Sequence, residues 1–174
     1  MTAELTASPG GRLTPPHASE MRRVLGNFCT GVAVVTAHDG DRAIGFTCQS
    51  VTSVSLEPPY ISFCPSASST SWPLIRQAGA LCVNILAEGQ QEVCTRFASR
   101  SDDKFDGVSW RPGGNGAPVL DGTLACIEAD VEMEHVAGDH TIVVARVTRL
   151  WAHRERNPLL FFRGGFGALG GDHD

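Results

Sequence analysis

The stretch ACIEADVEME, residues 125–134, decides the fold of this chain. Its odd positions carry apolar side chains, and after Cys126 its even positions carry Glu or Asp. A period of two is typical of a β-strand with one face on a core and the other in water. The turn Ala137-Gly138-Asp139 follows, and residues 141–147 form a second apolar run. We therefore expect the two runs to pair as an antiparallel hairpin.

Shorter apolar runs elsewhere have the length and the β-branched or aromatic content of strands. They cover residues 32–36, 43–47, 60–63, 81–86 and 159–162. With the hairpin, they predict about seven strands. This pattern indicates a mainly β fold, an antiparallel β-barrel with a few short helices.

Three short helices are expected. Residues 18–28 carry Met21, Val24, Leu25 and Phe28 at helical spacing. The other two helices are predicted over residues 72–78 and 89–98. In the latter, Val93 and Phe97 lie four residues apart on one face.

The helix at residues 72–78 has clear end signals. Ser71 is the predicted N-cap, and Gly79 is the predicted stop. The serine-rich run before it would lie where a helix start presents free amide hydrogens, which is a natural place for a phosphate. The same serines also fit a simple turn and cap.

The 174 residues, 42% of them hydrophobic, fit one domain with a sizeable core. We expect a leader over residues 1–17, the domain over 18–166 and a tail over 167–174. A net charge of −5 and the lack of a Lys/Arg cluster argue against nucleic acid as a partner. No apolar run approaches the roughly 20 residues that span a membrane, and no signal peptide is recognisable, so the cytoplasm is favoured.

The cysteines and the motifs that the sequence lacks argue against several kinds of site. The six cysteines are scattered and none forms a CxxC, so they are interpreted as small buried apolar residues. No GxGxxG, GxSxG or HExxH motif is present, which disfavours a Rossmann domain, a serine hydrolase and a zinc site. We expect no metal.

Polar residues of small size crowd residues 45–59, GFTCQSVTSVSLEPP, where a core strand would carry bulky side chains. Residues 64–71, CPSASSTS, add further hydroxyls. One segment suits a flat ring with polar edges and the other suits a phosphate, and these are the two ends of a flavin mononucleotide unit. Arg100 and Lys104 are either parts of a helix connection or cations that meet the phosphates. His140 either faces a ligand or bonds Asp139 or the backbone.

Taken together, these segments resemble the flavin reductase family, and more narrowly the reductase components of two-component flavin-dependent monooxygenases. The resemblance spans about residues 20–166. The motifs that carry it are GNFCTGVAVVT (26–36), GFTCQSVTSVSLEPP (45–59), the serine loop before Ser71-Trp72, CVNIL (82–86), FASRSDDKF (97–105), GDH (138–140) and PLLFFRGGF (158–166).

The resemblance implies a split barrel of the FMN-binding type that works as a homodimer, with the flavin sites near the subunit interface. It also implies that NADH reduces FAD, or FMN, by hydride transfer, and that the reduced flavin diffuses to a separate monooxygenase. No catalytic residue is needed from the protein, because the two cofactors carry the chemistry. The partner oxygenase, and the choices of FAD over FMN and of NADH over NADPH, stay open at this stage.

The resemblance also assigns residues by position. Thr47, Cys48, Gln49 and Ser50 would edge the isoalloxazine, with Val54 and Ser55 beside them. Cys64, Pro65, Ser66, Ser69, Thr70 and Ser71 would hold the ribityl and phosphate end, and Phe97 and Ala98 would continue the nucleotide site. His140, Arg163 and Phe166 would line the nicotinamide side, with His140 as the residue that positions the nicotinamide.

Two positions depart from the family pattern. Many relatives have Thr-Ala-Asn where this chain has Thr47-Cys48-Gln49, and a tyrosine in place of Phe166. Two alternatives stay open beside the reductase: an oxidase of the pyridoxamine phosphate type, and a non-catalytic barrel that binds flavin or haem. The first would need more basic residues for a phosphorylated substrate than this chain supplies.

Overall fold

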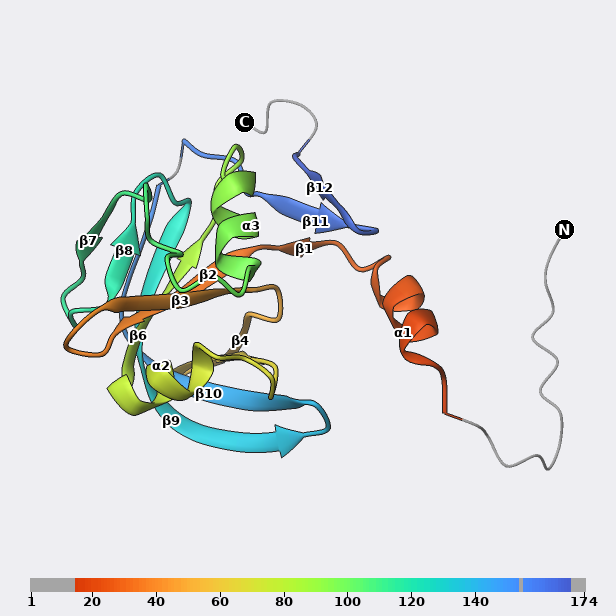
Figure 1. Ribbon diagram of the computed structural model, residues 1–174, viewed down its shortest axis with the longest axis horizontal. Coiled ribbons are helices and arrows are strands. Elements are labelled where there is room, and N and C mark those ends of the chain that lie inside the picture. Colours follow the sequence, from red (N-terminus) through yellow and green to blue (C-terminus); the bar gives the residue numbers. More distant parts are fainter. Residues whose placement is uncertain (1–14, 154, 170–174) are drawn as a thin grey trace, which may run out of the picture.

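The computed structural model describes residues 15–153 and 155–169, and it is mainly β with three helices (Figure 1). Residues 1–14 of the expected leader and residues 170–174 of the expected tail lie outside the described residues. The helices are α1 (Ala18–Leu25), α2 (Trp72–Ala78) and α3 (Gln91–Ala98). The strands are β1 (Thr30–Gly31), β2 (Ala33–His38), β3 (Ala43–Cys48), β4 (Thr52–Leu56), β5 (Pro59–Phe63), β6 (Ala80–Ile85), β7 (Trp110–Pro112), β8 (Pro118–Leu120), β9 (Ala125–Ala137), β10 (His140–Ala152), β11 (Leu160–Phe162) and β12 (Gly165–Gly167).

The predicted hairpin lies in the middle of the main sheet. Strands β9 and β10 pair antiparallel from His140 opposite Ala137 to Ala152 opposite Ala125, and Gly138 adopts a φ of 64° in the turn. Seven strands follow the order β3-β2-β6-β9-β10-β5-β4, which leaves β3 and β4 at the two edges. The sheet curves around its own core (Figure 1). Two small sheets, β1-β11-β12 and β7-β8, lie beside it.

Two helices complete the core. Trp72 of α2 packs edge-on against Phe63 of β5, with ring centroids 5.6 Å apart. Phe97 of α3 is fully buried in a second cluster with Val34 and Leu159. The bounds of α2 match the sequence prediction, and Gly79 ends the helix with a φ of 76°.

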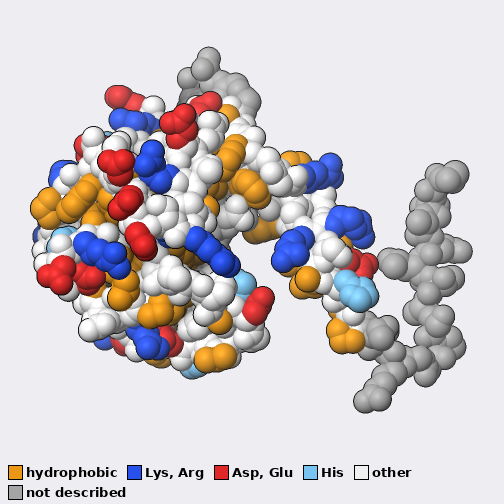
Figure 2. Space-filling model, in the orientation of Figure 1, with side chains coloured by type: hydrophobic (Ala, Val, Ile, Leu, Met, Phe, Trp, Pro, Cys, Tyr) orange, Lys and Arg blue, Asp and Glu red, His pale blue; other side chains and the backbone are white. Residues whose placement is uncertain are grey.

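The first helix differs from the other two. It projects from the body of the molecule and buries none of its residues (Figure 1). Met21, Val24, Leu25 and Phe28 are 45%, 53%, 60% and 76% exposed. Hydrophobic side chains are accordingly visible on this projecting segment (Figure 2). The helix was therefore predicted where it lies, but it ends at Leu25 and not at Phe28, and its apolar residues have no partner within the described part of this chain.

The alternation rule is wrong at Glu128 and Met133 of β9, since Met133 was expected on the core face and is 43% exposed. Glu128 was expected in water, yet it is 2% exposed. Its carboxylate accepts the backbone N–H groups of Gly114 at 2.7 Å and Asn115 at 3.2 Å. The loop between β7 and β8 therefore covers this carboxylate, and the hydrogen bonds offset the cost of burying it.

The cysteines largely follow the prediction. Cys48, Cys82, Cys94 and Cys126 are buried thiols, whereas Cys29 is exposed and Cys64 is half-buried. Within residues 15–153 and 155–169, no group of His, Cys, Asp and Glu side chains is arranged to hold a metal ion. The described helices are all too short or too polar to cross a membrane.

Candidate functional site

A cavity of about 530 Å³ lies where the end of β3, the loop after β5, the end of α3 and the β9–β10 turn meet. Its volume is in the range of small-molecule and cofactor sites. It is lined by Phe46, Thr47, Cys48, Gln49, Ser50, Cys64, Pro65, Ser66, Ser68, Ser69, Thr70, Ser71, Phe97, Ala98, Ser99, Arg100, Lys104 and His140.

Gly45 allows one wall of this cavity to form. A β-carbon at Gly45 would lie 2.8 Å from Cε1 of Phe97 and 3.0 Å from the backbone oxygen of Val35. Only glycine leaves room for the fully buried Phe97 ring to lie directly against β3. Thr47, two residues on, ties the same strand to the helix by donating its hydroxyl to the Cys94 carbonyl at 2.6 Å.

Among the lining serines that accept a hydrogen bond from the protein are Ser50, Ser69 and Ser71. Ser50 Oγ accepts the N–H of Cys64 at 2.8 Å, and Ser69 Oγ accepts the N–H of Trp72 at 3.1 Å. Ser71 Oγ accepts from Nζ of Lys104 at 3.2 Å. An accepted bond leaves the hydroxyl proton available, so each serine can donate to an anionic group in the cavity.

Ser71 lies at the predicted N-cap position of α2, but its side chain does not cap the helix. Ser71 has helical backbone angles and makes no capping bond, and Ser69 accepts the first helical N–H instead. Pro73 has no N–H to offer. The start of α2 therefore has fewer free amides than the sequence suggested, and the loop hydroxyls and nearby cations are the main groups available to an anion.

Lys104 is the only lysine in the chain, and it is 8% exposed. Its Nζ donates to the Gly45 carbonyl at 3.1 Å and to Ser71 Oγ. Burial lowers the pKa of Lys104, and the charge of Asp102 partly opposes this change. Within the described residues Lys104 forms no ion pair with a carboxylate. A buried cation of this kind favours an anionic ligand.

The charge of the cavity is the opposite of that of the whole chain. The net charge is −5, yet Arg100 and Lys104 line the cavity and none of the described lining residues is Asp or Glu. Low-dielectric walls strengthen the attraction of such cations for an anion.

The β9–β10 turn brings His140 to the cavity. Thr141 donates its N–H to the Pro65 carbonyl at 3.0 Å, and Ala67 donates to the Asp139 carbonyl at 2.9 Å. The His140 ring faces the Asp139 carboxylate, with Nδ1 2.8 Å from Oδ1, and this bond lowers the pKa of Asp139. Because a carboxylate only accepts, Nδ1 carries the proton and a neutral His140 leaves Nε2 as an acceptor. The bond to Asp139 that the sequence allowed is thus present, and His140 also lines the cavity.

Most of the predicted site residues come together in this cavity. Those that line it are Thr47, Cys48, Gln49, Ser50, Cys64, Pro65, Ser66, Ser69, Thr70, Ser71, Phe97, Ala98, Arg100, Lys104 and His140. Four do not line it. Val54 and Ser55 lie on the edge strand β4, while Arg163 and Phe166 belong to the β11–β12 hairpin.

Arg163 contacts the residues that follow α1 and does not reach the cavity. It donates its backbone N–H to the Gly26 carbonyl at 2.9 Å and its Nε to Asn27 Oδ1 at 2.8 Å. Phe166 packs on Phe161, with ring centroids 5.4 Å apart. These contacts join the C-terminal hairpin to the end of α1, away from the cavity lining.

Phe46, Ser68 and Ser99 line the cavity but were not predicted to do so. Ser68 lies within the serine run, and Ser99 follows Phe97-Ala98, so proximity in the sequence would have found both. Phe46 gave no signal, because a buried aromatic residue in a strand is usually part of a core.

Comparisons with known proteins identify the family of this chain. Residues 25–170 match the family described as "Flavin reductase like domain". The chain belongs to the flavin reductase family. This confirms the family predicted from the sequence.

Several relatives are named as reductases of monooxygenase systems. The chain is 49% identical over 143 residues to the reductase subunit HsaB of a flavin-dependent monooxygenase from Rhodococcus jostii, which covers 82% of this chain and 73% of that protein. It is 48% identical over 149 residues to a flavin reductase from Pseudomonas putida, covering 85% and 88%. Among solved structures, the NADH:FAD oxidoreductase SgcE6 of Streptomyces globisporus, in complex with NAD and FAD fragments, has a TM-score of 0.87 at 34% identity, covering 95% of this chain and all of that one (100%).

Proposed function

We propose that this chain is the NADH-dependent reductase component of a two-component flavin-dependent monooxygenase, and that its cavity binds a flavin and NADH. One observation carries the assignment to this cavity: a site of about 530 Å³ holds Arg100 and Lys104, with no carboxylate among its described lining residues, in a chain of net charge −5. Flavin and NADH are both anionic through their phosphates. The membership of the flavin reductase family supports the activity.

The flavin phosphate is assigned to the end of the cavity near Lys104. Ser69 and Ser71 have hydroxyl protons to donate there, and Arg100 and Lys104 supply positive charge. Lys104 is held by Gly45 and Ser71 before any ligand arrives, so little side-chain entropy is lost on binding.

The ring is assigned to the other end, beside Thr47, Cys48, Gln49 and Ser50. When both are bound, NADH supplies a hydride and the flavin accepts it. Thr47 has committed its proton to the Cys94 carbonyl, so toward a ligand it can only accept. Ser50 accepts from Cys64 and can donate, which suits a ring edge that gains negative charge. None of these residues is assigned as an acid or a nucleophile, because hydride transfer between two cofactors requires neither from the protein.

His140 is assigned to the nicotinamide. Its Nδ1 bonds Asp139 and the residue lines the cavity, so a neutral ring has Nε2 available as an acceptor. An acceptor at this position can orient the carboxamide N–H₂ of the nicotinamide. His140 is therefore a residue that positions NADH, and it transfers no proton.

We also propose that the working form is a homodimer. Met21, Val24 and Leu25 of α1, with Phe28 just after it, are each at least 45% exposed, and a second copy of the chain would cover them. Arg163 bonds Asn27 after α1, and Phe166 packs on Phe161 within the β11–β12 hairpin, so neither lies at the cavity of its own chain. Their predicted nicotinamide role therefore needs the cavity of a second copy. Light scattering coupled to size exclusion tests this, and a monomeric wild type would exclude it.

FAD is the proposed preferred flavin, with FMN as a weaker substrate. The activity is tested by NADH absorbance in the presence of FAD, FMN or no flavin, with an oxygen electrode to follow reoxidation of the reduced flavin. Flavin-dependent NADH consumption is expected. A purified, folded protein that consumes no NADH with either flavin would refute the proposed function.

A further inference from the structure

A second, smaller cavity of about 90 Å³ adjoins the phosphate end of the main cavity. Thr70, Ser71 and Lys104 line both cavities, so they form the partition between them. Beyond the partition, the smaller cavity is lined by Arg42 of the β2–β3 connection and by Asp102. Its volume leaves room for a phosphate group.

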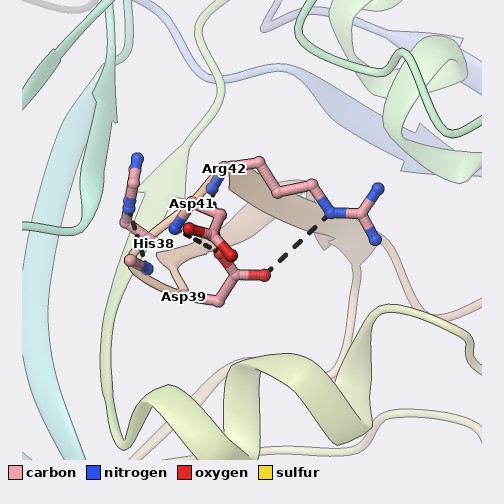
Figure 3. Close-up of polar contacts among 5 residues, drawn as sticks. His38, Asp39, Asp41 and Arg42 are labelled. Atoms are coloured by element: carbon pink, nitrogen blue, oxygen red, sulfur yellow. Dashed lines mark hydrogen bonds and ion pairs between the residues drawn. The ribbon is translucent and has the colours of Figure 1, made fainter.

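Arg42 has donors to offer in this cavity. Its Nε lies 4.0 Å from the Asp39 carboxylate, which also accepts the backbone N–H of Arg42 at 2.9 Å. Figure 3 shows the side chain extended, with Nε facing Asp39 and the two terminal nitrogens pointing away from that carboxylate. Among the described residues, no acceptor is bonded to these two nitrogens. A guanidinium with a free fork is suited to a phosphate.

We propose that the smaller cavity takes the second phosphate of FAD and that Arg42 is the residue that distinguishes FAD from FMN. The proposal rests on the proposed function, in which the first flavin phosphate lies beside Ser71 and Lys104. The two phosphates of FAD are directly linked, so the second one falls next to the first, over the exposed Thr70. FMN has no second phosphate and gains nothing from Arg42.

The charges around this cavity set the sign of the expected effects. Arg42 and the buried Lys104 attract a phosphate, and Asp102 repels it. Removal of the Arg42 side chain should therefore weaken FAD binding, and neutralisation of Asp102 should strengthen it. Neither residue should influence FMN strongly, because its single phosphate lies on the other side of the partition.

The experiment measures the Kd of FAD and of FMN by quenching of flavin fluorescence, with wild type, Arg42→Ala and Asp102→Asn. Arg42→Ala should raise the Kd for FAD about tenfold, equal to about 1.4 kcal/mol, and leave the Kd for FMN within about twofold. Asp102→Asn should lower the Kd for FAD about twofold or more. The matched control is Arg76→Ala, since Arg76 is similarly exposed (60% against 56%) and pairs with Glu134 at 3.6 Å, but lies in neither cavity. It should leave both Kd values unchanged.

Three results would overturn the proposal. The first is an unchanged Kd for FAD in Arg42→Ala, and the second is an equal loss for FAD and FMN. The third is a higher KM for NADH, measured with FMN as acceptor, together with an unchanged Kd for FAD. The cavity would then hold a phosphate of NADH. The wild type oxidises NADH with FMN if only this proposal fails, whereas it does not do so if the proposed function fails.

Discussion

Replacing Gly45 with alanine tests how the cavity wall is built. The added β-carbon would lie 2.8 Å and 3.0 Å from two carbons of the Phe97 ring and 3.0 Å from the Val35 carbonyl oxygen. Phe97 is fully buried and meets Phe105 edge-on at 4.9 Å, so its ring has little room to withdraw. Overpacking of this kind costs about 1–3 kcal/mol. We expect the melting temperature to fall by about 4–8 °C for a loss of about 2 kcal/mol.

The same substitution should weaken flavin binding. Phe97 lines the cavity, and the Gly45 carbonyl holds Lys104 at 3.1 Å, so a shift of β3 disturbs both. Thermal and urea unfolding give the stability, and fluorescence quenching gives the Kd for flavin. The control is Gly31→Ala, since a β-carbon there would meet nothing within 4 Å. It should change stability by no more than about 0.5 kcal/mol.

A second variant decides whether Phe97 is the cause. Phe97→Leu removes the ring edge that the new methyl group would strike, so it should be less harmful in the Gly45→Ala background than alone. A coupling energy above about 0.5 kcal/mol is expected from the double-mutant cycle. Additive effects, or a Gly45→Ala protein as stable as the wild type, would refute the packing argument.

Three further substitutions probe the site. His140→Ala should raise the KM for NADH severalfold with little change in the Kd for flavin, and equal losses of both would contradict its nicotinamide role. Thr47→Val leaves the Cys94 carbonyl without its donor and should cost about 1 kcal/mol in urea unfolding; an unchanged midpoint would argue against this bond. Burial lowers the pKa of Lys104 from its ordinary 10.5, so the folded state binds fewer protons than the unfolded state just below that pH. The free energy of unfolding of the wild type, relative to Lys104→Met, should therefore rise with pH in that alkaline window, and a difference independent of pH would count against it.

Local chemistry made much of this structure predictable. The alternation in residues 125–134 and the Gly138 turn predicted the β9–β10 hairpin, and the bounds of α2 were correct. Small polar residues in two neighbouring segments also predicted most of the cavity lining. Such signals depend on periods of two or 3.6 residues and on turn geometry, and a sequence displays these directly.

Strands without such a signal were missed. β4 lies inside the polar stretch 45–59, and β7 and β8 are three residues each around a glycine-rich loop. Their pairing is decided by the strands beside them rather than by their own composition. The exposed stripe of α1 shows the reverse case, in which the periodicity predicts the helix but does not say what covers it.

The sequence by itself determined the mainly β class, the central hairpin and the family. Only the tertiary structure decided that Lys104 is a buried cation between two cavities and that Glu128 is buried under a loop. It also decided that Arg163 bonds Asn27 at the end of α1 and does not line the cavity of its own chain. Each of these depends on residues far apart in the chain, such as Lys104 and Gly45, which are 59 positions apart. Burial and charge environment arise only when such segments pack together, because the dielectric and the partners of a side chain are properties of its neighbours in space.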